Sequence, residues 1–140
     1  MAGKKVIEAL QLHRKGYNCA QSVAVPFCEE LNMDKTAAFR ALEGFGGGMG
    51  CYGLTCGALS GAVFVAGLIN SDGNIEKPQS KRKTYEICKA AVEKFQKECG
   101  SDCCHELKGI DTGKPLVPCD KCIATGAAIA EKILAEYKRK

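Results

Sequence analysis

Cysteine is the residue through which this chain is best equipped to do chemistry. The sequence contains ten cysteines in 140 residues. Four of them lie in the first turn of a predicted helix: Cys19, Cys56, Cys104 and Cys119. Free backbone amides and the positive end of the helix dipole stabilise anions there, so each thiol is predicted to ionise below the ordinary cysteine pKa of about 8.5. Because the thiolate is the form that binds metals and attacks disulfides, these four residues are the predicted site.

The other six cysteines form two groups. Three lie close in sequence to the first four and are candidate second-tier ligands, resolving thiols or bystanders: Cys51, Cys103 and Cys122. Three fall on apolar helical stripes and are predicted to be core residues, because buried cysteine packs like a small apolar side chain: Cys28, Cys88 and Cys99. The C-x-x-C spacing of Cys119 and Cys122 does not indicate a thioredoxin-like pair, since no βαβ pattern accompanies it.

Capping signals locate the helices that carry these cysteines. The predicted starts are marked by Asn18 with Gln21 as a capping box, by Asp34, by Thr55, by Ser101 or Asp102, and by Pro118. Gly16 and Gly100 are predicted stops, because glycine adopts the left-handed conformation that ends many helices. Each of the four cysteines is therefore tied to a defined helix end.

Apolar residues recur at steps of three and four along the chain, and no alternating strand pattern interrupts them. This predicts an all-α fold, a single-domain compact bundle of about five to six helices over residues 1–140. A helix from Cys56 to Ile69 is apolar all round and is predicted to be central and the most buried. Gly57 and Gly61 would let neighbouring backbones approach it. The segment Gly44–Gly50 is predicted to be a flexible loop that lets backbone approach Cys51 and Cys56 closely or wraps a cofactor.

Composition excludes several classes of function. Lysine and arginine number 20 against 16 acidic residues, and no aromatic-rich basic face accompanies them, so nucleic-acid binding is not predicted. The apolar run from Leu54 to Ile69 is shorter than the roughly 20 residues that span a bilayer, so no membrane insertion is expected. Met1–Leu10 lacks the pattern of a secretory signal, which predicts a cytoplasmic protein. Cytoplasmic thiols stay reduced, and this favours metal ligation or redox chemistry over structural disulfides.

Five landmarks together resemble the redox-active C_GCAxxG_C_C family of small bacterial and archaeal proteins. They are "GYNCAQSV" (Gly16–Val23), "GFGGGMG" (Gly44–Gly50), "CGALSGAVFVAGL" (Cys56–Leu68), "GSDCCHEL" (Gly100–Leu107) and the helix that begins at Cys119. The resemblance covers nearly the whole chain and implies that the family's recurrent cysteines are Cys19, Cys56, Cys104 and Cys119. A related domain occurs in split-Soret cytochromes, but this chain has no C-x-x-C-H, so covalent haem is not expected.

Three hypotheses about function follow. The first is an iron–sulfur cluster held by the four cysteines for electron transfer or redox sensing, since such clusters need four thiolates. The second is a cluster-free thiol/disulfide oxidoreductase that uses low-pKa cysteines and a resolving thiol. The third is a structural Cys₄ zinc site, which the dispersed ligand spacing disfavours. An unidentified redox partner protein is expected, and a homodimer is predicted because short helices would leave part of the apolar surface uncovered.

Overall fold

Local capping interactions determine where the first helices begin and end. Gly16 follows the first helix with a φ of 118°, the left-handed conformation predicted for a stop. Asn18 and Gln21 form the predicted capping box, with both backbone-to-side-chain hydrogen bonds at 2.9 Å. The Asp34 side chain accepts a hydrogen bond of 2.8 Å from the Ala37 amide at the start of the third helix.

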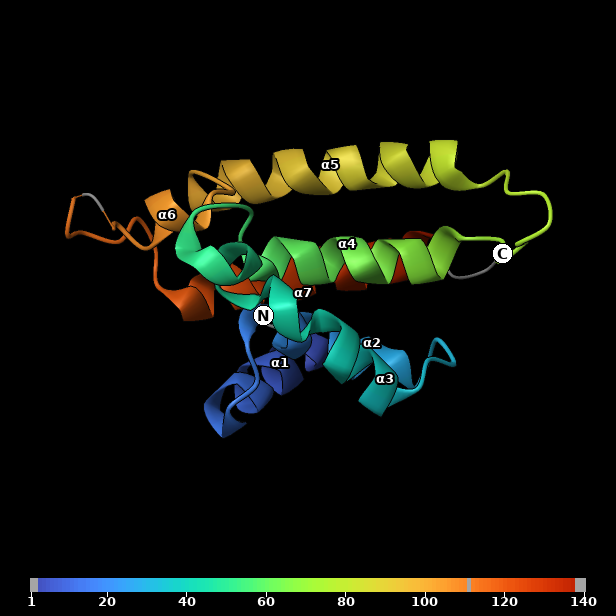
Figure 1. Ribbon diagram of the computed structural model, residues 1–140, viewed down its shortest axis with the longest axis horizontal. Coiled ribbons are helices and arrows are strands. Elements are labelled where there is room, and N and C mark those ends of the chain that lie inside the picture. The colour runs from blue at the N-terminus through green and yellow to red at the C-terminus, as the bar shows by residue number, and fades with distance from the viewer. Residues whose placement is uncertain (1–2, 111, 138–140) are drawn as a thin grey trace.

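The computed structural model describes residues 3–110 and 112–137 as an all-α bundle, which confirms the predicted fold class (Figure 1). Seven α-helices follow in chain order: α1 (Lys4–Lys15), α2 (Cys19–Cys28), α3 (Lys35–Leu42), α4 (Gly57–Asn70), α5 (Lys81–Cys99), α6 (Cys104–Leu107) and α7 (Cys119–Tyr137). Two shorter turns, η1 (Glu43–Phe45) and η2 (Gly48–Tyr52), connect α3 to α4. The single-turn helix α6 brings the number above the five or six expected.

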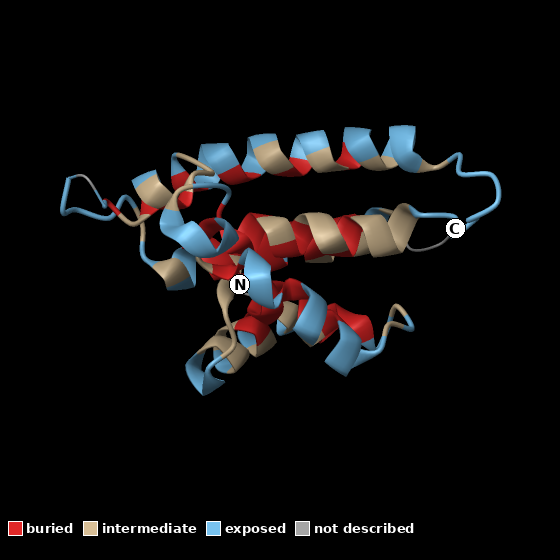
Figure 2. Cartoon of the chain, viewed as in Figure 1, coloured by how far each residue is buried: buried red, intermediate tan, exposed pale blue. Residues whose placement is uncertain are grey.

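Helix α4 is central, as predicted. It packs against α2, α5 and α7, and Figure 1 shows it between α5 on one side and α1 to α3 on the other. The expectation that it is also the most buried helix is wrong. Every residue of α2 from Ala20 to Cys28 is buried, whereas Val63, Phe64 and Leu68 of α4 are only half-buried (Figure 2). Helix α2 packs against α1, α3, α4 and α7, so it has neighbours on more sides than α4.

The start of α4 differs from the sequence-based prediction. Cys56, and not Thr55, is the N-cap residue of this helix. Thr55 is instead exposed and forms an isolated antiparallel bridge with Cys103. The reason is that the chain enters α4 in an extended conformation paired with the segment before α6, which draws Thr55 out of the capping position.

None of the helices in the described part of the chain combines the length and the apolar composition needed to cross a membrane. The apolar run that the sequence analysis singled out contains most of the 14-residue helix α4, which packs against α2, α5 and α7.

Candidate functional site

The starts of four helices meet at one small cavity of about 20 Å³. Five cysteines line this inner cavity: Cys19, Cys56, Cys104, Cys119 and Cys122. The four predicted site cysteines are thus brought together, and Cys122 joins them from the second tier. A cavity of this size is close to the volume that one water molecule needs, so the thiols lie near one another.

Glycines on α4 bring the Cys19 end of α2 against the site. A Cβ atom built on Gly57 would lie 3.1 Å from the Cys19 Cβ, and one on Gly61 would lie 2.7 Å from the carbonyl oxygen of Ala20. Real Cβ atoms rarely come so close, so the helices can approach this far only because both positions are glycine. The structure therefore confirms the role that the sequence analysis gave to Gly57 and Gly61.

Another glycine, which the sequence analysis did not single out, positions α7. A Cβ atom on Gly126 would lie 2.7 Å from the carbonyl oxygen of Ala58. This contact between α7 and α4 brings the first turn of α7, with Cys119 and Cys122, beside the start of α4. The sequence does contain a signal for this contact. Gly126 is a small residue in the middle of a helix, seven positions after Cys119.

Backbone hydrogen bonds place Cys56 beside Cys104, although 47 residues separate them in the chain. The Cys56 amide donates to the Asp102 carbonyl, and the Cys104 amide donates to the Leu54 carbonyl, both at 2.7 Å. These bonds flank the bridge between Thr55 and Cys103. The two cysteines therefore start α4 and α6 from adjoining stretches of extended backbone.

The glycine-rich segment forms a left-handed turn rather than a simple flexible loop. Four successive residues have positive φ: Gly47 at 61°, Gly48 at 59°, Met49 at 68° and Gly50 at 75°. Gly48 lies against Cys104, since a Cβ atom built on Gly48 would overlap the Cys104 Cβ. Met49 adopts the left-handed conformation at a cost, and such strain is concentrated at functional positions. The turn forms one wall of the inner cavity.

Cys19 and Cys119 form the first pair of hydrogen-bonded thiols. The Cys19 S–H donates to the Cys119 sulfur, and this bond, helped by the positive charge of Lys108, lowers the Cys119 pKa to about 5 against the opposing effect of burial. The same bond and burial raise the pKa of Cys19, because its proton is held between the two sulfurs. Lys108 Nζ donates to Cys119 Sγ at 3.6 Å. One thiol of the pair is thus a stabilised thiolate and the other its proton donor.

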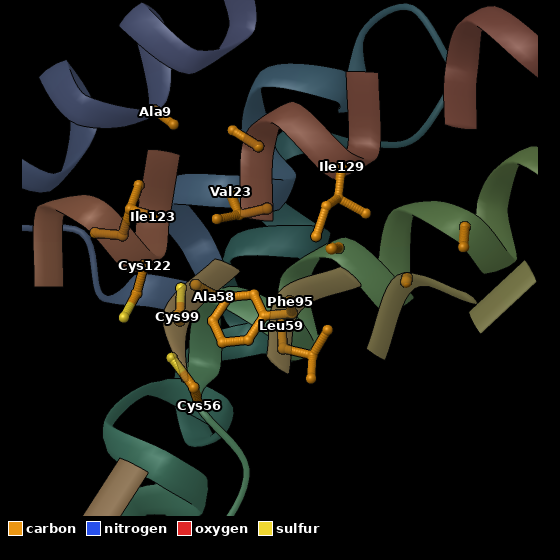
Figure 3. Close-up of a cluster of buried hydrophobic side chains, with 14 of the residues drawn as sticks. Ala9, Val23, Cys56, Ala58, Leu59, Phe95, Cys99, Cys122, Ile123 and Ile129 are labelled. Atoms are coloured by element: carbon orange, nitrogen blue, oxygen red, sulfur yellow. The ribbon is translucent and has the colours of Figure 1, made fainter. Parts of the chain in front are cut away.

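Cys56 and Cys122 form the second pair. The Cys122 S–H donates to the Cys56 sulfur and lowers the Cys56 pKa to about 7, while burial opposes the shift and the amides of Ala58 and Leu59 add to it. The pKa of Cys122 is raised by this bond and by burial. Cys99 contacts Cys122 as well, and Figure 3 shows the side chains of Cys56, Cys99 and Cys122 at one edge of the buried cluster.

These shifts correct the expectation that all four helix-start thiols ionise easily. The pKa is lowered at Cys56 and Cys119 but raised at Cys19 and Cys104. Burial is the main cause at Cys104, and the neighbouring Cys56 charge adds to it. When thiols crowd together, one negative charge opposes the next, so the helix dipole cannot ionise all of them at once.

The remaining cysteines lie outside the inner cavity. Cys28 is buried between α2 and its neighbours and Cys88 is half-buried on α5, as predicted for core residues. Cys99 is also in the core, but its contact with Cys122 joins it to the site, which the sequence analysis did not predict. Cys51 is exposed and Cys103 half-buried. All ten cysteines are free thiols.

Lys108 is a further functional residue that the sequence analysis missed. It lies four residues after Cys104, at the end of α6, and it lines the inner cavity. Its Nζ also lies 5.5 Å from the centre of the Tyr52 ring, a distance that permits a cation–π interaction. The i, i+4 spacing of a lysine from a helix-start cysteine was the signal that could have identified it.

Two negative findings limit the chemistry. Among residues 3–110 and 112–137, no group of three or more His, Cys, Asp or Glu side chains has the arrangement that holds a single metal ion. A larger hollow of about 840 Å³ lies between α5 and α7, but no cysteine lines it. Of these two cavities, only the inner one is lined by cysteines.

A family model described as "Putative redox-active protein (C_GCAxxG_C_C)" matches residues 17–133. The matched segment begins two residues before Cys19 and ends beyond Cys122, so it contains every cysteine of the inner cavity. No curated protein and no solved structure matches the chain.

Proposed function

Because the chain belongs to the C_GCAxxG_C_C family of redox-active proteins, we propose that its inner cavity is a redox centre that binds an iron–sulfur cluster. Cys19, Cys56, Cys104 and Cys119 would be the ligands. A bound cluster would supply one-electron transfer, either to a partner protein or as a redox signal. The observation that carries the proposal is the convergence of these four thiols, from four separate helix starts, on one cavity.

The number and type of the donors suit a cluster. Both [2Fe–2S] and [4Fe–4S] clusters take four cysteine thiolates. A zinc ion at about 2.3 Å from each sulfur would need a tight tetrahedral group, which is not found among the described residues. A cluster contains its own sulfides and holds its ligands farther apart. The cavity would therefore have to widen to admit a cluster, and the glycine-rich turn beside Cys104 is one of the walls that would have to shift.

The surroundings would stabilise the negative charge of such a centre. The amides of Ala58 and Leu59 act on the Cys56 sulfur, and the Lys108 ammonium acts on Cys119. Hydrogen bonds and positive charge near the sulfurs favour the reduced state, so they raise the reduction potential.

A second candidate function is favoured by the two thiol pairs. In each pair one thiol has a lowered pKa and its neighbour holds a proton, which suits a nucleophile and a resolving thiol. Without a cluster, the Cys119 thiolate would attack a partner's disulfide and expel one partner thiolate. Cys19 would then displace the second partner thiolate, leaving a Cys19–Cys119 disulfide and a partner reduced by two electrons. The one proton of the pair, carried by Cys19, passes to one partner thiolate, and the other partner thiolate takes its proton from solvent.

Anaerobic purification separates the two functions. The cluster predicts a brown protein with iron and acid-labile sulfide, and a visible absorption that bleaches on reduction by dithionite. The dithiol centre predicts a colourless protein that, after mild oxidation, contains Cys19–Cys119 or Cys56–Cys122 disulfides by mass spectrometry. A colourless protein in which neither disulfide forms would contradict both.

A further inference from the structure

Two further thiols, Cys51 and Cys103, lie outside the inner cavity and next to Gly53. The Cys51 thiol donates to the Gly48 carbonyl at 3.5 Å, and the Cys103 thiol donates to the Gly53 carbonyl at 3.5 Å. A Cβ atom on Gly53 would lie 3.7 Å from Cys51 Sγ. Both sulfurs therefore lie against the same glycine, although 51 residues separate the two cysteines in the chain.

These two thiols differ from the inner ones in their access to solvent. Cys51 is exposed, Cys103 is half-buried, and neither lines the inner cavity. The turn presents Cys51 among exposed apolar side chains, with Met49 45%, Tyr52 52% and Leu54 55% exposed. Met49 and Tyr52 both have positive φ, so this exposed arrangement is maintained against backbone strain. A strained turn that displays a thiol within an apolar surface is suited to meet a reagent from solution.

We propose that Cys51 and Cys103 form an outer dithiol that exchanges with disulfides presented from solvent. Cys51 is the attacking residue, because it is the more exposed of the two, and Cys103 is the resolving residue. Gly50 and Gly53 flank the attacking residue on either side, and their backbone freedom lets Cys51 close onto Cys103. The proposal concerns thiols outside the inner cavity and holds whether or not that cavity binds a cluster.

The exchange balances in two steps. The Cys51 thiolate attacks one sulfur of the incoming disulfide, forms a mixed disulfide and expels one thiolate. The Cys103 thiolate then attacks Cys51 Sγ and expels the second thiolate. One disulfide of the reagent is reduced to two thiols, which take up the two protons, and the two cysteines are oxidised to one Cys51–Cys103 disulfide.

The test uses the full-length protein, purified anaerobically with whatever cofactor it retains, and glutathione disulfide as the probe. After a short reaction, free thiols are alkylated and the protein is digested and mapped. The expected product is a Cys51–Cys103 disulfide. Trypsin leaves Cys51 with Cys56 on one peptide and Cys99, Cys103 and Cys104 on another, so fragment spectra must identify the linked residues.

Variants assign the two roles. In Cys103→Ser, we expect glutathione to accumulate on Cys51, because the mixed disulfide is no longer resolved. In Cys51→Ser, the early attachment of glutathione to the protein should be lost, and Cys103 should stay reduced. Cys88→Ser, with a half-buried thiol on α5, is the matched control and should react like the parent. Early linkage of Cys51 to Cys56 or Cys104, first modification at another cysteine, or unchanged resolution in Cys103→Ser would overturn the proposal.

Discussion

Lys108 Nζ lies 3.6 Å from Cys119 Sγ, which places a positive charge beside the thiol with the lowest pKa of the inner cavity. The lysine comes from the end of α6 and the cysteine from the start of α7, so the contact also holds these elements together. The pKa of Lys108 is in turn raised by the Cys119 charge. The two residues stabilise each other's charged forms.

Replacing this lysine should raise the pKa of Cys119. In metal-free Lys108→Met, the thiolate loses its nearby cation, so the pH profile of iodoacetamide alkylation at Cys119 should move to higher pH. Peptide mapping after timed alkylation measures the profile. Lys89→Met, which removes an exposed lysine of α5, should leave it unchanged. A Cys119 profile that does not move in Lys108→Met would contradict the electrostatic role of the lysine.

The four thiols of the two pairs should differ in their pH dependence in the metal-free protein. Cys119 and Cys56 have lowered pKa values, about 5 and about 7, so their alkylation should rise through those pH values. Cys19 and Cys122 have raised pKa values and should stay unreactive until distinctly more alkaline pH. The same mapping experiment reports all four. Equal profiles within a pair would show that no proton is held between its sulfurs.

Gly57→Ala should separate α2 from α4 at the site. Its new methyl group would meet the Phe45 carbonyl at 3.0 Å and the Cys19 Cβ at 3.1 Å. We expect a loss of about 1–3 kcal/mol in the free energy of unfolding, as for other overpacked positions. Urea unfolding measures it. Gly67→Ala on the same helix has no neighbour within 4 Å and should be neutral or stabilising, so an equal loss in both variants would contradict the close approach.

Gly48→Ala should disturb the cavity wall more than an ordinary glycine substitution. The residue has a φ of 59°, and its Cβ atom would overlap Cys104. Gly73 has a similar φ of 64° but open space around it, so Gly73→Ala isolates the backbone strain alone. We expect the loss of thermal stability to be clearly larger in Gly48→Ala. Equal melting temperatures in the two variants would mean that the turn does not press against Cys104.

The predictable part of the fold and site came from local signals. The capping box at Asn18 and the glycine stops act through neighbouring residues, so their sequence patterns suffice to place Cys19. The small residues of α4 indicate a close helix approach but do not identify α2 as the partner at Gly57 and Gly61. Cys119 was placed by the proline before it. The all-α class followed from the apolar periodicity.

The parts that were missed depend on contacts between distant segments. Thr55 lost its capping role to a pairing with Cys103, and Cys99 met Cys122 through the packing of α5 on α7. The raised pKa values of Cys19 and Cys104 result from crowding, which no single helix start reveals. The homodimer and the cytoplasmic location stay predictions, and sedimentation at several protein concentrations measures the first.

The most direct test of the cluster is the iron and acid-labile sulfide content of Cys104→Ala. Cys104 lines the inner cavity but belongs to neither of the two thiol pairs there. A cluster in this cavity would therefore need Cys104, whereas a dithiol centre in the cavity would not. Cys28→Ala, which removes a buried cysteine of the core, is the control for folding. We expect iron and sulfide in the anaerobically purified parent and in Cys28→Ala. Cys104→Ala should lose both while its helical circular dichroism persists. Full iron and sulfide in Cys104→Ala, or none in the parent, would contradict it.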